Sequence, residues 1–152
     1  LDDAIEDAME TVSGLFPDAV HWKELQDLVD RAMELAEEEM DDLDAIRELG
    51  EGFVAEETLA IAIYCALKYE NDFERAMIAA VNHSGDSDST ASVAGNILGA
   101  FLGVRKIPTK FLRPLEMLDI IAEIADDLYD GCRPDPATGQ VSPEWAEKYL
   151  VE

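Results

Sequence analysis

The sequence predicts an all-α fold, a compact bundle of several helices. Apolar residues recur at the three- and four-residue spacing of one helix face through most of the 152 residues. No segment alternates convincingly between apolar and polar residues as a half-buried strand would. Segment 55–68 is apolar almost all round, which is typical of a helix that other helices surround. Because 48% of the residues are hydrophobic, the chain can bury a core, and we expect one all-helical domain over residues 1–152.

Each expected helix is bounded by its periodicity and by local signals. The first seven segments are 2–12, 22–40, 42–49, 55–68, 73–81, 91–104 and 115–129. Gly14 and Pro17 are expected to end the first helix. Asp72 is expected to form a turn or the N-cap before the fifth helix. The segments 106–114 and 130–143 are expected to be irregular. Ser142, followed by Pro143, predicts the N-cap of a last short helix.

A row of small residues follows the sixth of these helices. Gly95, Gly99 and Gly103 recur every four residues, with Ala91 in the same row. Each helical glycine is less favourable than alanine by roughly 1 kcal/mol. We therefore expect another helix backbone to pack closely against this row.

The composition limits the classes of partner. A formal net charge of −24 argues against nucleic acid or an anionic membrane as a partner. We expect a well-solvated acidic surface, including the acidic run 37–42. Two cysteines make no disulfide framework, and Cys65 is expected to be a core residue. Without a signal peptide or an apolar run of membrane-spanning length, a cytoplasmic protein is the default expectation.

The beginning of the chain suggests a fragment of a longer protein. Leu1 stands directly before a helical pattern, and no initiator methionine precedes it. A truncated bundle would expose an apolar face, so a homodimer is one expectation.

Small, polar and acidic residues gather in segment 82–90, between two apolar segments. Asp86 and Asp88 flank Ser87 in a turn where their carboxylates can converge, and Ser89 can add a hydroxyl. Such oxygen donors suit Mg²⁺, Mn²⁺ or Ca²⁺ better than Zn²⁺. Asp and Ser are also common helix N-caps, so capping and metal binding are both open from these residues alone.

Two other motifs fit the cluster poorly. An EF-hand loop from Asp86 would need Gly and Glu where Ala91 and Ile97 stand. The nucleophile motif of haloacid-dehalogenase-type phosphatases would have to end a buried strand, whereas residues 76–81 continue a helical pattern.

The wider context resembles the C-terminal half of the ADP-ribosylglycohydrolase family, over roughly residues 22–150. Its most specific part is Gly-Asp-x-Asp-Ser at 85–89, followed by Ala-Gly-x-x-x-Gly-Ala at 94–100. Gly-Phe-Val-Ala-Glu-Glu-Thr at 52–58 lies upstream, and Ile107-Pro108 and Leu115-Glu116 lie downstream.

This resemblance implies a site of two Mg²⁺ or Mn²⁺ ions. In the family they are held jointly by an N-terminal Thr-Asp-Asp motif and a C-terminal Asp-x-Asp-Thr/Ser motif. By position, Asp86, Asp88 and Ser89 would be the C-terminal ligands, with Thr90 a less favoured alternative to Ser89. The reaction it implies cleaves the glycosidic bond between ADP-ribose and a protein side chain or a small acyl group.

The chain departs from the family because it has no Thr-Asp-Asp sequence. We therefore expect the C-terminal part of a longer enzyme, acting on an ADP-ribosylated protein or an ADP-ribose derivative and inactive without its N-terminal half. The alternative is a non-catalytic ADP-ribose-binding or protein-interaction domain that retains the fold.

The roles of other polar and aromatic residues are expected to be structural. His83 is expected to hydrogen-bond locally rather than act as a base, and Glu56 or Glu57 to cap or support the site. Trp22, Trp145 and Tyr149 are expected to be packing residues. Catalytic and substrate-binding residues stay unassigned.

Overall fold

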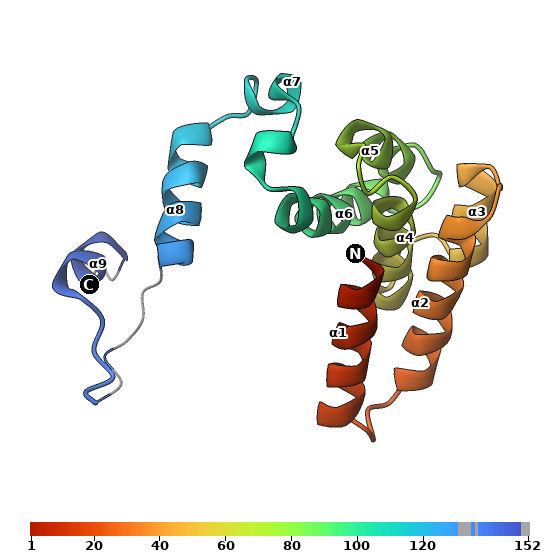
Figure 1. Cartoon of the computed structure of the whole chain (residues 1–152), viewed down its shortest axis with the longest axis horizontal. Helices are drawn as coiled ribbons and strands as arrows, with labels where there is room; N and C mark the ends of the chain where they lie inside the picture. Colours follow the sequence, from red (N-terminus) through yellow and green to blue (C-terminus); the bar gives the residue numbers. More distant parts are fainter. Residues whose placement is uncertain (131–134, 136, 150–152) are drawn as a thin grey trace. The chain divides into compact units, whose positions relative to one another are not determined.

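A computed structural model of the chain describes residues 1–130, 135 and 137–149. The predicted all-α class is confirmed, since the described residues form helices and no strand (Figure 1). They divide into two units, Leu1–Pro108 (unit 1) and Thr109–Glu152 (unit 2), and each is described by itself.

Unit 1 contains six α-helices and one 3₁₀ turn. They are α1 (Asp2–Leu15), α2 (Trp22–Glu37), α3 (Asp42–Leu49), α4 (Ala55–Lys68), α5 (Phe73–Val81), α6 (Ser87–Leu102) and η1 (Val104–Lys106). The bounds of α3, α4 and α5 are those predicted from the sequence. Helix α2 ends at Glu37, where the predicted segment continued to residue 40, because Glu38 has an extended backbone.

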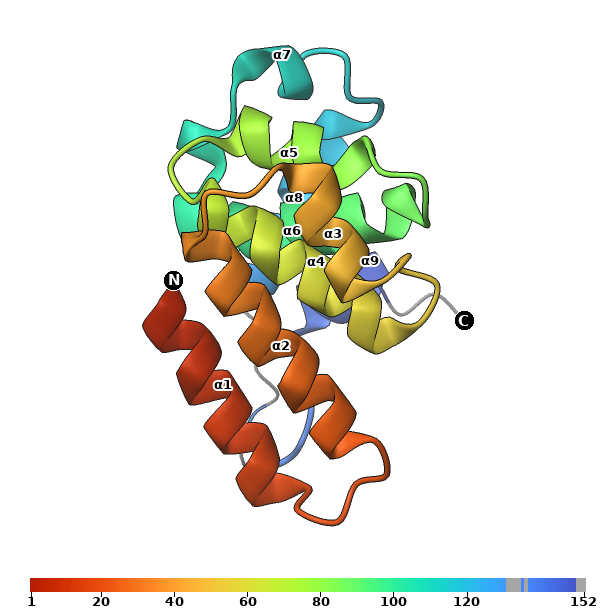
Figure 2. The same ribbon diagram turned by 90° about the vertical axis from the view of Figure 1, so that its right-hand side faces the viewer.

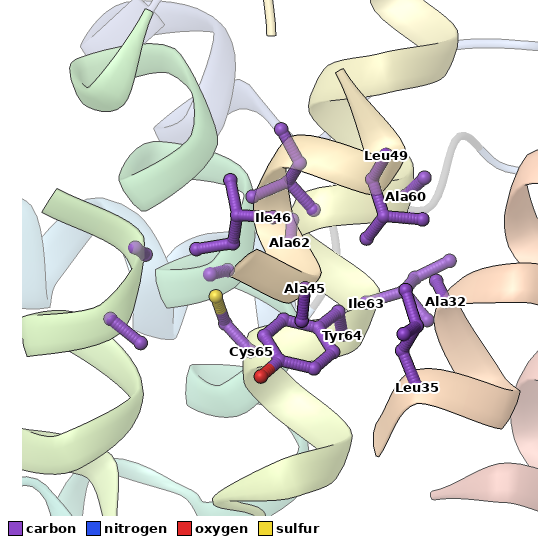
Figure 3. Packing of buried hydrophobic residues seen from close by; sticks show 14 of the residues in the cluster. Ala32, Leu35, Ala45, Ile46, Leu49, Ala60, Ala62, Ile63, Tyr64 and Cys65 are labelled. Carbon is purple, nitrogen blue, oxygen red and sulfur yellow. The ribbon is translucent and has the colours of Figure 1, made fainter. Parts of the chain in front are cut away.

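Helix α4 forms the centre of unit 1. Seven consecutive residues, Ala60 to Ala66, are buried, because α2 and α3 pack on one side of α4 and α5 and α6 on the other (Figure 1). Figure 3 shows Ala45 of α3 next to the Tyr64 ring of α4, with Leu35 of α2 to one side. Cys65 lies in this core with no exposed surface, as predicted. Burial raises the pKa of its thiol to about 12.

Asp42 is less solvated than the sequence suggested for the acidic run 37–42. Its carboxylate accepts hydrogen bonds from the Tyr64 hydroxyl at 2.8 Å and from the Tyr69 hydroxyl at 2.8 Å. Lys68 donates to the Met40 carbonyl oxygen at 2.8 Å and to the Tyr64 hydroxyl at 2.9 Å. These bonds join the start of α3 to the end of α4, so the expectation of a purely solvated run is wrong at Asp42.

Helix α1 continues to Leu15, so the predicted break at Gly14 is wrong. A Cβ atom added to Gly14 would meet no atom of the described residues within 4 Å, so this position lies on an open face. A single helical glycine is unfavourable by only about 1 kcal/mol, which a helix can tolerate. The helix ends at Leu15, and Phe16, the residue before Pro17, is its C-cap.

The glycine row of α6 is not covered as predicted. A Cβ atom on Gly95 would lie 3.8 Å from the Met77 sulfur, which is ordinary contact, and one on Gly99 would meet no described atom within 4 Å. No helix backbone therefore approaches Gly99 in the part of the chain that the structure describes.

Unit 2 contains α7 (Thr109–Leu112), α8 (Leu118–Asp130) and α9 (Pro143–Tyr149). Helix α7 lies within the segment predicted to be irregular, and α8 begins three residues later than predicted. The predicted N-cap of α9 is confirmed, because the Ser142 hydroxyl accepts a hydrogen bond from the Trp145 N–H at 3.2 Å. Residues 131–134, in the second expected loop, and Cys132 with them, lie outside the described residues.

No helix among the described residues combines the length and hydrophobicity needed to cross a bilayer. Figure 2, turned by 90° from Figure 1, shows α1 and α2 of unit 1 running side by side as an antiparallel pair.

Candidate functional site

The acidic cluster occupies the first turn of α6. Asp86 is the N-cap residue, and Ser87, Asp88 and Ser89 follow as the first helical residues. The helix therefore begins four residues earlier than predicted, since short polar side chains are tolerated at a helix start. Asp88 is exposed, while Asp86 and Ser89 are half-buried.

The Asp86 carboxyl group lies close to the Ser89 and Asp88 side chains. The Ser89 side chain is the largest cause of a pKa of Asp86 below its ordinary value, followed by the Asp88 side chain. The nearby Ser89 N–H group acts in the same direction. Asp86 nevertheless makes no side-chain hydrogen bond of normal capping geometry. The first turn of α6 thus presents two neighbouring carboxyl groups and a hydroxyl.

Neighbouring carboxylates repel one another when both are ionised, and a cation between them removes that repulsion. Hard divalent cations prefer oxygen ligands of this kind. Among the described residues, no three His, Cys, Asp or Glu side chains come together as a metal-binding group. By themselves, the described residues thus bring two carboxylates and one hydroxyl to this turn, fewer donors than a hard divalent cation takes.

The backbone before the cluster is held by a second loop, residues 50–53. The Asp86 N–H donates to the Glu51 carbonyl oxygen at 2.8 Å. Gly85 allows this approach, because a Cβ atom there would overlap the Glu51 carbonyl group. Gly52 has a φ of 78°, and a Cβ atom added to it would lie only 2.9 Å from the Thr90 methyl carbon. The two loops are thus fitted closely together.

The first turn of α4 fixes this second loop. The Glu57 carboxylate accepts from the Glu51 N–H at 3.1 Å and from the Gly52 N–H at 3.0 Å. The Thr58 hydroxyl donates to the Gly52 carbonyl oxygen at 2.7 Å. The expectation of a supporting role for one of the two glutamates is confirmed for Glu57. The roles of Thr58 and of the Glu51 carbonyl were missed, because they depend on contacts between separate loops.

Hydrogen bonds of Thr90 and His83 fix the loop that precedes the cluster. The Thr90 side chain is fully buried, and its hydroxyl donates to the Ala80 carbonyl oxygen at 2.9 Å. His83 Nε2 lies 2.8 Å from the same hydroxyl, and the Gly85 N–H donates to His83 Nδ1 at 3.2 Å. Since Nδ1 accepts, Nε2 carries the proton and donates to Thr90. The Thr90 hydroxyl is therefore occupied within the fold, whereas the Ser89 side chain lies near the Asp86 carboxyl group.

This arrangement favours neutral His83. Burial is the main cause of a pKa below the ordinary value, outweighing the raising effects of the Ala80 backbone and of Asp86. Protonation would also destroy the acceptor that the Gly85 N–H uses. The structural role expected for His83 is confirmed by these two bonds.

A pocket of about 490 Å³ opens beside the loop that precedes the cluster. Ile46 and Arg47 of α3, Gly50, His83 and Gly85 are among the residues that line it. Arg47 brings a positive charge to the pocket, although its guanidinium also donates to Asp44 at 2.6 Å. A ligand placed here would lie next to the loops that hold Asp86.

The family model for ADP-ribosylglycohydrolases matches residues 1–137. The chain belongs to the ADP-ribosylglycohydrolase family. It is 29% identical over 133 residues to the ADP-ribosylhydrolase ARH3 of Homo sapiens, covering 79% of this chain and 35% of that protein. It is 33% identical over 79 residues to the ADP-ribosylarginine hydrolase Tri1 of Pseudomonas putida, covering 52% of this chain and 21% of that protein.

The chain spans about a third of the length of the human relative. An uncharacterized protein of Archaeoglobus fulgidus is 35% identical over 86 residues, covering 57% of this chain and 27% of that protein. No solved structure matches the chain. Membership of the family thus rests on the sequence, and the all-α structure agrees with it.

Proposed function

We propose that the chain is the C-terminal part of an ADP-ribosylglycohydrolase that hydrolyses the glycosidic bond between ADP-ribose and a protein side chain or a small acyl group. The observation that carries the proposal is the placement of Asp86, Asp88 and Ser89 together at the start of α6, where Asp86 is the N-cap residue and the other two lie in the first turn. The family match and the names of two relatives, an ADP-ribosylhydrolase and an ADP-ribosylarginine hydrolase, support the same activity.

In this proposal, Asp86, Asp88 and Ser89 hold one side of a site for two Mg²⁺ or Mn²⁺ ions. Residues of an N-terminal half, outside this chain, complete the shell. When bound, such ions orient ribose hydroxyls and activate a water for attack on the glycosidic carbon. The residues of this chain hold the ligands in place, because the Glu51 carbonyl fixes the Asp86 backbone and buried Thr90 fixes the turn behind it.

The metal site is tested by titrating Mn²⁺ into the protein by isothermal calorimetry. Asp88→Asn should weaken binding by at least tenfold, because it removes a charged ligand. Asp119→Asn is the matched control, since Asp119 is the second residue of α8 as Asp88 is of α6, and it should change binding little. Equal binding by wild type and Asp88→Asn would contradict a role for Asp88 as a metal ligand.

The activity is tested on a longer protein that joins this chain to a segment bearing a Thr-Asp-Asp motif. With Mn²⁺ it should release ADP-ribose from a modified protein, and Asp88→Asn should remove nearly all release. The chain alone should be inactive or nearly so. Binding of ADP-ribose by the longer protein without any release would support the non-catalytic alternative instead.

A further inference from the structure

A groove of about 520 Å³ lies between α1 and α2 and shares no lining residue with the pocket beside the acidic cluster. The two helices run side by side in opposite directions (Figures 1 and 2). The lining residues that matter here are Glu6, Met9 and Glu10 of α1, with Trp22, Asp30 and Met33 of α2. This groove is unexplained by the proposed function.

Helical spacing places these residues on two facing stripes. Residues 6, 9 and 10 share one face of α1, and residues 22, 30 and 33 recur along one face of α2. Met9, Trp22 and Met33 are half-buried, whereas Glu6, Glu10 and Asp30 are exposed. The groove therefore combines an apolar base with an acidic edge, and among the described residues no Lys, Arg or His lines it.

Helix α1 leaves this groove open because it packs weakly. Ile5 is its only residue buried in the core, and Val12 and Leu15 stay exposed. Gly14, at the far end of the groove, presents no side chain and faces open space. A partner element could thus lie along α1 and α2 without displacing a core side chain.

We propose that this groove binds a basic amphipathic helix of a partner protein. Methionine side chains adapt to different apolar partners, and the indole of Trp22 offers a large apolar surface. The acidic edge complements Lys and Arg on either side of an apolar stripe. A second copy of this chain fits poorly, since it would bring another net charge of −24 against an acidic edge.

The size of the groove suits a helix of a few turns. Helix α1 has 14 residues, and at 1.5 Å per residue it offers about 21 Å of length. Trp22 and Met33 are 11 residues apart on α2, or about 16.5 Å, so a partner helix with apolar residues at i, i+4, i+7 and i+11 would span the apolar base of the groove. Its lysines would then reach Glu6, Glu10 and Asp30.

The probe for the test is a synthetic helix of leucine and lysine, about 14 residues long, with all leucines on one face. The protein carries Trp145→Phe, which leaves Trp22 as its single tryptophan. Binding should shift Trp22 emission to shorter wavelength, and amide shifts in NMR spectra should concentrate on α1 and α2. A glutamate twin of the peptide, and a scrambled peptide with the leucines spread around the helix, should bind at least tenfold more weakly.

Charge variants separate this site from general attraction to an acidic protein. Glu6→Gln, Glu10→Gln and Asp30→Asn together should weaken binding about tenfold, since exposed ion pairs contribute modestly each. Glu39→Gln, Glu116→Gln and Glu147→Gln remove the same charge from exposed positions outside the groove and should change binding less than threefold. Equal losses in the two triple variants, equal binding of the scrambled peptide, or an unchanged Trp22 emission would overturn the proposal.

Discussion

Gly85 shows what one residue contributes to the arrangement of the acidic cluster. Any side chain there would overlap the Glu51 carbonyl group, to which Asp86 hydrogen-bonds. Gly85→Ala should therefore destabilise the protein by about 3 kcal/mol, the upper end of the range of about 1–3 kcal/mol for overpacked sites, because the overlap is with backbone atoms. Chemical denaturation monitored by circular dichroism measures this change.

Gly99→Ala is the matched control for Gly85→Ala. Its Cβ would meet no described atom within 4 Å, and it lies inside α6, so alanine should stabilise by up to about 1 kcal/mol. Destabilisation by both substitutions would contradict the open environment of Gly99. Stability unchanged by Gly85→Ala would contradict the close fit of the two loops.

The contribution of His83 to the stability of the folded protein depends on pH. Its folded-state pKa is lowered, chiefly by burial, so the unfolded chain takes up the proton first as pH falls. The contribution of His83 to stability is complete above its unfolded pKa of about 6.5 and is lost as pH falls below that value. His83→Gln should remove this part of the dependence.

Other groups also change the free energy of unfolding with pH, because protonation of an acidic chain relieves repulsion between carboxylates. A second variant is therefore needed for comparison. His21→Asn replaces the other histidine, which is exposed, and keeps a residue type that tolerates its φ of 68°. Between pH 7.5 and 5.5, thermal unfolding of His83→Gln should lose less stability than that of His21→Asn. Parallel curves would show that His83 does not titrate on unfolding.

The sequence singled out the right residues of the cluster but not their setting. Asp86, Asp88 and Ser89 were found because a run of short polar residues between apolar helices is visible in the sequence. Their support by the Glu51 carbonyl was not visible, because a backbone atom carries no residue-specific signal. The choice of Ser89 over Thr90 came from the family resemblance, and burial of Thr90 now supplies a physical reason for it.

At the scale of elements, the start of α4 acts as the support of loop 50–53. The Glu57 carboxylate accepts two backbone N–H groups of that loop. Glu57→Ala should leave both without their charged acceptor and destabilise the protein by about 1.5–3 kcal/mol. Hydrogen exchange at Glu51 and Gly52 should become faster than in wild type.

Glu56→Ala tests whether the effect of Glu57→Ala is specific. The two glutamates are adjacent on α4 and carry the same charge, but only Glu57 bonds to loop 50–53 among the described contacts. Glu56→Ala should leave hydrogen exchange at Glu51 and Gly52 unchanged. Faster exchange in both variants would assign the effect to charge at the helix start rather than to the two hydrogen bonds.

The sequence predicted helix bounds correctly where apolar periodicity reflects burial in the core. Helices α3, α4 and α5 have the predicted bounds, because their apolar periodicity is clear, and Asp41 and Asp72 cap α3 and α5. Predictions failed at two other places: α1 passes through Gly14, because one helical glycine is unfavourable by only about 1 kcal/mol, and α7 forms where prolines suggested a loop. The contacts of a glycine row are likewise not encoded locally, so the open face at Gly99 could not be foreseen.

At the scale of the whole molecule, the core belongs to unit 1. Every buried residue among those described lies between Ile5 and Leu98, and no described side chain of unit 2 is buried. Apolar residues of α8 such as Ile120 and Ile121 are about half exposed, at 47% and 48%. Because burial of apolar surface drives folding, unit 1 carries the stabilising contacts that the described residues show.

A chain ending at Pro108 should therefore unfold cooperatively. Its thermal midpoint should lie within several degrees of the intact protein, the shift that about 1 kcal/mol produces in a domain of this size. Segment 109–152 alone should show weak helicity without a cooperative transition, since a few short helices without a core are marginal in water. Loss of the cooperative transition on truncation, measured by circular dichroism or calorimetry, would contradict the assignment of the core to unit 1.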